Sequence, residues 1–101
     1  MLRESLAADL RTDELAPRVV RPGWANYCFA NLPDTVRSLF GADPRRPLPD
    51  DVLDGVDVSV EHVVCVWVDG FGWNRLRRAH EDHPFLDSLC ERTTVSPLTS
   101  T

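Results

Sequence analysis

The segment CVWVDGFGWN, residues 65–74, is an apolar run that ends at one acid, Asp69, followed by two glycines on either side of a phenylalanine. If this run is buried, an isolated carboxylate is costly, because desolvation disfavours its charged form. Asp69 is therefore expected to have a partner, and a divalent cation such as zinc or manganese is one candidate. Gly70 and Gly72 have no Cβ and would let backbone and metal approach closely. Capping of the helix expected at Trp73 and an ordinary salt bridge are the alternatives.

The motif HEDH, residues 80–83, is a second candidate for metal chemistry because its two histidines are three residues apart. The spacing encloses an acidic pair and runs directly into Pro84, which favours a solvated loop and a helix cap. His62 precedes the apolar run and is interpreted as a boundary residue.

The apolar positions alternate from Val56 and become continuous through VVCVWV. A continuous apolar run of this length is typical of a strand that is covered on both faces, and hence of a parallel or mixed sheet. We therefore predict a central strand over residues 61–68. Functional groups of such sheets collect outside the carboxyl ends of the strands, and Asp69 would stand at one of these ends.

Proline, glycine and apolar spacing predict the elements around this strand. Helices are expected over residues 2–16, 33–40, 72–80 and 83–93, a single turn closed by Gly55, and a short hydroxyl-rich strand over residues 93–101. The segment ADPRRPLPDD, residues 42–51, is expected to be a linker, because it contains three prolines. The order strand, helix, helix, strand in the second half is that of an α/β unit.

Apolar side chains of two predicted helices are assigned to the core. In the helix over 33–40 the expected stripe is Val36, Leu39 and Phe40, with Gly41 ending the helix in a left-handed conformation. The helix over 83–93 is expected to bury its apolar positions, which are Phe85, Leu86 and Leu89.

The charge balance argues against a nucleic-acid-binding protein. The formal net charge is −5, from 16 acidic and 11 basic residues, and every basic residue is an arginine. The only local basic cluster is Arg75, Arg77 and Arg78, which is interpreted as a solvated helix face and not as a phosphate-backbone patch.

Cysteine usage and the N-terminus indicate the compartment. Three cysteines, Cys28, Cys65 and Cys90, have no metal-binding spacing, and their odd number without a secretory leader suits a reducing compartment. They are expected to pack as small apolar residues. Because charges interrupt the leucines of the first 17 residues, no signal peptide or membrane span is expected, and the sequence predicts a cytoplasmic protein.

Three other interpretations of VWVDGFG fail on the residues themselves. A haloacid-dehalogenase-like phosphotransferase requires a first acid where Trp67 stands. The GFG triplet lacks the third glycine of a dinucleotide-binding loop, and a Walker motif needs a lysine, which this sequence does not contain.

The segments VVCVWVDGFGWNRL and HPFLDSLCERTTVSPLTST together resemble the N-terminal part of the catalytic domain in the alkaline phosphatase superfamily. The similarity is to the type I phosphodiesterase and nucleotide pyrophosphatase branch and covers roughly residues 61–101. In that branch a strand ends on a metal-binding Asp in a D-G-F motif, a P-x-L-D-x-L helix follows, and a P-T-x-T-F-P stretch supplies a threonine nucleophile. The corresponding motifs here are residues 69–71, 84–89 and 97–101.

The resemblance implies that Asp69 is a metal ligand and that Thr101 is both a metal ligand and the catalytic nucleophile. It implies two divalent metal ions, zinc or else manganese, which would favour the threonine alkoxide and stabilise the leaving oxygen. The implied substrate is a phosphodiester, a nucleotide or a pyrophosphate. The F-P that follows the nucleophile in the family is absent, as are the downstream Asp and His ligands, so the isolated chain is expected to be inactive.

The fold implied by the resemblance is α/β, the N-terminal portion of a three-layer alkaline-phosphatase-like domain with a mainly parallel sheet. Residues 1–60 would form a helical and irregular segment with a Pro-rich linker, and residues 61–101 the start of a truncated catalytic domain. The expected partner is the missing C-terminal part of the domain, or a second copy of the chain. The alternative is a non-catalytic acidic α/β remnant that acts as an interaction module through its exposed sheet edge and apolar face.

Overall fold

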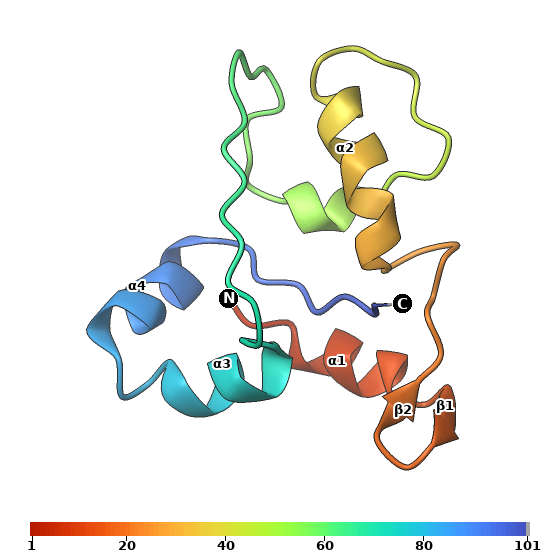
Figure 1. Cartoon of the computed structure of the whole chain (residues 1–101). Coiled ribbons are helices and arrows are strands. Elements are labelled where there is room, and N and C mark those ends of the chain that lie inside the picture. Colours follow the sequence, from red (N-terminus) through yellow and green to blue (C-terminus); the bar gives the residue numbers. More distant parts are fainter. Residues whose placement is uncertain (101) are drawn as a thin grey trace.

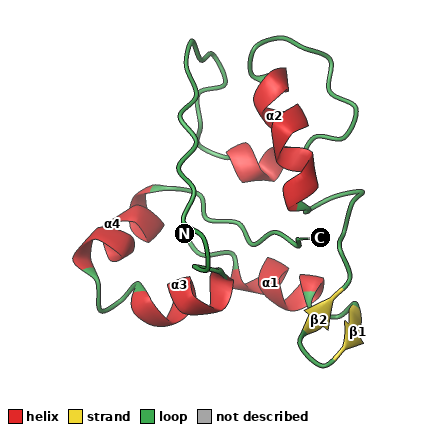
Figure 2. Cartoon of the chain, viewed as in Figure 1, coloured by secondary structure: helices red, strands yellow, loops and turns green. Residues whose placement is uncertain are grey.

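A computed structural model of the chain describes residues 1–100, and Thr101 lies outside the described part. Residues 1–100 contain four α-helices and one small antiparallel sheet. The helices are α1 (Glu4–Leu10), α2 (Leu32–Ser38), α3 (Trp73–Ala79) and α4 (Pro84–Arg92), and the strands are β1 (Glu14–Ala16) and β2 (Val19–Val20). Long loops join them (Figure 2).

The N-terminal helix is shorter than predicted, because a hairpin takes the second half of the predicted 2–16 helix. α1 ends at Leu10, where the hydroxyl of Thr12 donates to the carbonyl of Asp9 at 2.7 Å. Pro17 and Arg18 then form the turn between β1 and β2, and Arg18 has a φ of 66°. A positive φ is uncommon for a residue with a side chain, so this turn holds Arg18 in a strained conformation.

The helices over residues 33–40, 72–80 and 83–93 are confirmed, with bounds shifted by one or two residues. Pro33 and Pro84 each lie in the first turn of their helix, where proline has no amide to lose. Gly41 has a φ of 82°, which confirms its predicted left-handed conformation. Gly55, which was predicted only to close a turn, has a φ of 78°.

The faces that these helices bury were predicted correctly only in part, because Val36, Leu39 and Leu86 are half-buried but the other three predicted core residues are not. In α2 the buried residue is Thr35, whereas Phe40 is exposed. In α4 it is Cys90, whereas Phe85 and Leu89 are exposed. The reason is that little of the chain packs over these helices within residues 1–100, so their apolar stripes are only partly covered.

The C-terminal segment runs through the middle of the molecule, between α2 and α1 (Figure 1). It makes isolated parallel bridges at two points, Val95 with Leu2 and Thr99 with Cys28. The amide of Thr99 donates to the carbonyl of Tyr27 at 2.8 Å, and the amide of Phe29 donates to the carbonyl of Thr99 at the same distance. Within the described residues the predicted hydroxyl-rich strand is thus reduced to two isolated bridges, which join this segment to residues 2 and 28.

The predicted central strand over residues 61–68 is not formed by residues 1–100. The segment is extended, but none of its backbone groups pairs with another backbone group in this part of the chain. Val64, Val66, Trp67 and Val68 are 85, 82, 65 and 66% exposed. A strand needs a neighbour to satisfy its amides and carbonyls, and the described residues supply none.

The fold is therefore a mixture of helices and a small sheet, which agrees with the α/β class at a coarse level. The described residues contain no three-layer arrangement and no parallel sheet, because their only ladder is the antiparallel hairpin. Their buried apolar residues are few, namely Ala7, Cys28, Leu48 and Cys90. The radius of gyration of 14.3 Å exceeds the roughly 13 Å expected for a compact domain of this length.

Candidate functional site

Asp69 lies in an exposed turn with Gly70, and not at the end of a buried strand. The argument that burial forces a partner on Asp69 is therefore wrong, because residues 61–72 are exposed within the described chain. Its carboxylate makes no hydrogen bond or ion pair to residues 1–100. The salt bridge considered as an alternative is thus not formed in this part of the molecule.

The helix-capping alternative for Asp69 is not formed either. The N-cap of α3 is Gly72, whose conformation is extended, and no side chain caps this helix. Gly70 has a φ of 69°, and a Cβ built at either glycine meets no atom within 4 Å. Asp69 therefore stands beside open space, on a loop with little side-chain bulk.

Thr101 lies outside the described residues, so its predicted role as nucleophile and metal ligand has no structural test. The neighbouring hydroxyls have structural roles. The hydroxyl of Thr99 accepts from the amide of Gly23 at 2.8 Å and donates to the carbonyl of Tyr27 at 2.9 Å. Ser96 accepts from the guanidinium of Arg3 at 3.2 Å.

One cavity brings the loop after Asp69 and the end of the described chain together. Its volume is about 460 Å³, and its wall includes Gly72 and Trp73 on one side and Thr99 and Ser100 on another. The remaining wall comes from the end of α1 and from the β1–β2 hairpin. Residues more than 25 positions apart in sequence thus share a single depression.

The histidines of the HEDH motif lie at helix ends, which agrees with the predicted helix cap. His80 is the C-cap of α3 and His83 the N-cap of α4. The Nδ1 atom of His80 is 3.6 Å from a carboxylate oxygen of Asp87. Within residues 1–100 no three His, Cys, Asp or Glu side chains are grouped so that they could hold a metal ion.

A polar cluster that the sequence analysis missed joins residues 3, 27 and 51. The carboxylate of Asp51 accepts hydrogen bonds from the guanidinium of Arg3 and, at 2.7 Å, from the hydroxyl of Tyr27. The bond from Arg3 is the main cause that lowers the pKa of Asp51, and the bond to Asp51 is the main cause that raises the pKa of Tyr27. The three residues come from distant segments, so no local pattern announces the cluster.

The cysteines differ in their surroundings. Cys28 and Cys90 are buried, as expected of small apolar residues, but Cys65 is exposed on the apolar segment.

The basic cluster on α3 is exposed, which confirms the predicted solvated helix face; its members are Arg75, Arg77 and Arg78. The guanidinium of Arg77 lies 3.6 Å from a carboxylate oxygen of Glu4.

Comparisons with known proteins add no assignment: no family model matches the chain, and no curated protein or solved structure matches it significantly. No helix among the described residues has both the length and the apolar character needed to cross a lipid bilayer.

Proposed function

We propose that this chain carries the first part of a metal-dependent phosphodiesterase or nucleotide pyrophosphatase site. In this proposal Asp69 binds one of two divalent ions, zinc or manganese, and Thr101 attacks phosphorus. The proposal rests on the motif order described above and on one structural observation. Gly72, three residues after Asp69, and Ser100, next to Thr101, line the same cavity.

The surroundings of Asp69 support a ligand role. A free carboxylate on an exposed turn, flanked by a glycine with a positive φ, can reach an incoming cation without breaking another interaction. A tetrahedral zinc site needs about four ligands, and the described residues hold no group of even three. The residues present do not fit a complete metal centre, so no reaction step is assigned to a metal here.

The proposal therefore includes a larger protein. We propose that residues 61–101 start a three-layer α/β domain with a mainly parallel sheet, that its remaining strands pair with residues 61–68, and that the protein is cytoplasmic. The exposed, unpaired backbone of residues 61–68 supports this proposal, since neighbouring strands would satisfy these groups.

The test is hydrolysis of bis(p-nitrophenyl) phosphate by a longer protein in which this segment is followed by further metal ligands. We expect chelator-sensitive turnover that falls at least about a hundredfold in Asp69→Asn and in Thr101→Ala. The 101-residue chain alone should show no turnover with added zinc or manganese. Activity that survives both chelation and Thr101→Ala would refute the roles assigned to both residues.

A second candidate function is an interaction module without catalysis. The observation that favours it is the exposed apolar side chains of Val64, Val66 and Trp67 on one extended segment. Sedimentation separates the two candidates. A folded monomer that unfolds cooperatively supports a self-sufficient module, whereas an aggregating or molten chain supports the first part of a larger enzyme.

A further inference from the structure

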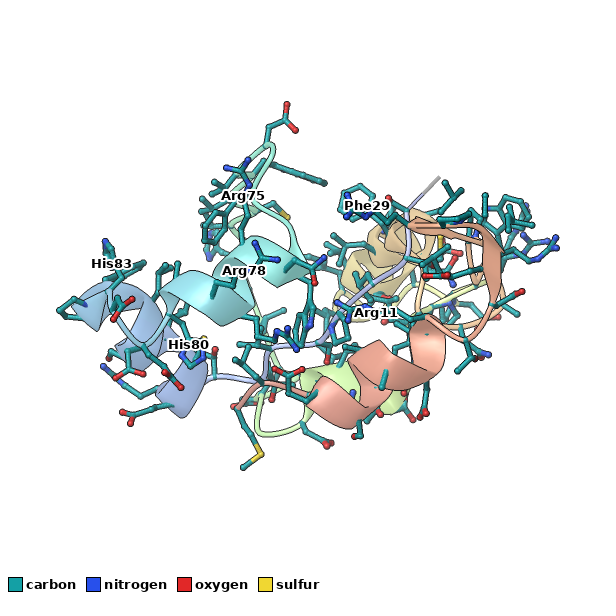
Figure 3. All side chains as sticks on the ribbon, turned by 90° about the horizontal axis from the view of Figure 1, so that it is seen from below. Arg11, Phe29, Arg75, Arg78, His80 and His83 are labelled. Carbon is teal, nitrogen blue, oxygen red and sulfur yellow. The ribbon has the colours of Figure 1, made fainter. Side chains whose placement is uncertain are left out.

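Thr99 is held through its amide, its carbonyl and its hydroxyl. The amide donates to the carbonyl of Tyr27 at 2.8 Å, and the carbonyl accepts from the amide of Phe29 at 2.8 Å. The hydroxyl accepts from the amide of Gly23 at 2.8 Å and donates to the carbonyl of Tyr27 at 2.9 Å. Thr99 is only 8% exposed, so little water competes for these four bonds. They fix the C-terminal segment to residues 23–29, and Phe29, beside this segment, is labelled in Figure 3.

The hydroxyl of Thr99 adds an anchor that the backbone alone does not supply. Residues 97–100 pair with another described segment at a single point, the parallel bridge between Thr99 and Cys28. One bridge fixes one pair of residues, and a pairing this short is weak by itself. The hydroxyl extends the contact to the amide of Gly23, which has no other acceptor among the described residues. The segment is thus attached at two points of the receiving loop.

The receiving loop is itself held in one conformation by a buried side chain. The side-chain amide of Asn31 donates to the carbonyls of Trp24 and Asn26, each at 2.9 Å. Asn31 is 2% exposed and Cys28 is fully buried. A buried polar side chain whose donors are both used restricts the backbone that it bonds. The loop therefore gives Thr99 a fixed surface on which to bind.

Thr99 also lies where the proposed function needs a fixed backbone. It lines the cavity of about 460 Å³ whose wall includes Gly72 and Ser100. It precedes the proposed nucleophile, Thr101, by two positions. A nucleophile reacts fast only when it is held close to the attack geometry, and a displacement of about 1 Å can lower the rate about a hundredfold.

We propose that Thr99 is a positioning residue for the proposed hydrolase, and that with residues 23–29 it fixes the segment that ends in Thr101. The inference rests on the proposed function and adds to its site a part of the chain before residue 61. The resemblance covers only residues 61–101 and gives residues 23–29 no role. Thr99 needs no contact with the substrate, because it acts through the backbone that leads to Thr101.

The kinetic test is made in the longer protein with bis(p-nitrophenyl) phosphate, well below the unfolding temperature of every variant. Thr99→Val removes the hydroxyl and keeps a side chain of similar shape. We expect kcat to fall about tenfold to a hundredfold and KM to stay within about threefold, because substrate binding is retained and the attack geometry is lost. Thr99→Ser keeps the hydroxyl and should bring kcat back to within about threefold of the wild type.

Thr94→Val is the matched control on the same segment. The hydroxyl of Thr94 donates to the carbonyl of Asp54 at 2.7 Å, which lies outside the receiving loop. Thr94→Val therefore loses a hydroxyl bond of the same kind without loosening Thr99, and kcat should stay within about twofold.

Hydrogen exchange on the 101-residue chain gives a readout that does not depend on activity. The amide of Gly23 should exchange about tenfold faster in Thr99→Val than in the wild type, because its acceptor is removed, and Thr99→Ser should restore slow exchange. The proposal is overturned if the exchange of Gly23 is unchanged in Thr99→Val, or if Thr99→Val keeps its kcat while Thr101→Ala is inactive. An active Thr101→Ala would refute the proposed function and the positioning role together, and faster exchange of Gly23 in Thr99→Val would then identify a purely structural bond.

Discussion

Replacement of Asp51 by asparagine should destabilise the chain by about 1–2 kcal/mol, because the carboxylate joins three segments through its bonds with Arg3 and Tyr27. A hydrogen bond to a charged group contributes about 1.5–3 kcal/mol, and partial exposure reduces this contribution. The side chains of Arg3 and Asp51 are 28 and 33% exposed, so the reduction is moderate. For a chain of this length the loss corresponds to a decrease of roughly 5–15 °C in unfolding temperature.

The assay is thermal and urea unfolding followed by far-UV circular dichroism at pH 7. Asp13→Asn is the matched control: Asp13 pairs with Arg21 at 3.3 Å, but their side chains are 64 and 55% exposed. Asp13→Asn should lower the free energy of unfolding by at most about 0.5 kcal/mol. If Asp51→Asn and Asp13→Asn have equal effects, the Arg3–Asp51–Tyr27 cluster does not stabilise the chain as argued here.

The pH dependence gives an independent check of the same cluster. The pKa of Asp51 is lower in the folded chain than its ordinary value of 3.8. The contribution of ionised Asp51 to the free energy of unfolding is therefore complete above the unfolded-state pKa of about 4, and it is lost as the pH falls through the folded pKa. The pKa of Tyr27 is raised, so its contribution is complete below about pH 10 and is lost as the pH rises through the folded value. The stability difference between wild type and Asp51→Asn should accordingly shrink below pH 4.

Three further predictions concern stability and association. Thr35→Val should cost about 1–3 kcal/mol in urea unfolding, because the buried hydroxyl accepts from the amide of residue 48 at 2.7 Å, and Thr35→Ser should restore most of the loss. Gly41→Ala should lower the free energy of unfolding by about 1 kcal/mol, because a φ of 82° strains any residue that has a Cβ. Gly72→Ala, at a φ of −83°, should leave the stability unchanged or raise it slightly. The double variant Val64→Thr with Val66→Thr should lower dye binding to exposed apolar surface and the sedimentation coefficient of any aggregate; no change in either would show that this segment is not the adhesive surface.

Local backbone chemistry made part of the fold predictable. Pro33 and Pro84 mark the starts of α2 and α4, and Gly41 adopts the left-handed conformation expected of it. Each of these signals acts within a few residues of its own position, so the sequence around it is sufficient.

The remainder depended on partners distant in sequence. Periodicity correctly identified residues 61–68 as apolar and extended, but it cannot show whether neighbouring strands exist, and within residues 1–100 they do not. The same limit applies to the candidate site. Asp69 was found from its motif, whereas Asp51 and Tyr27 gave no local signal, because only the tertiary fold brings them to Arg3.

The exposed segment 61–69 has a practical consequence. An endoprotease binds its substrate as an extended strand, and this stretch already has that shape with its backbone unpaired within residues 1–100. A cut there would not release the two halves, because Arg3 still donates to Val95 and Phe29 to Thr99 across the break. The nicked chain would behave as a two-peptide complex, in which a synthetic peptide covering α3, α4 and the extended end could be exchanged for the natural one.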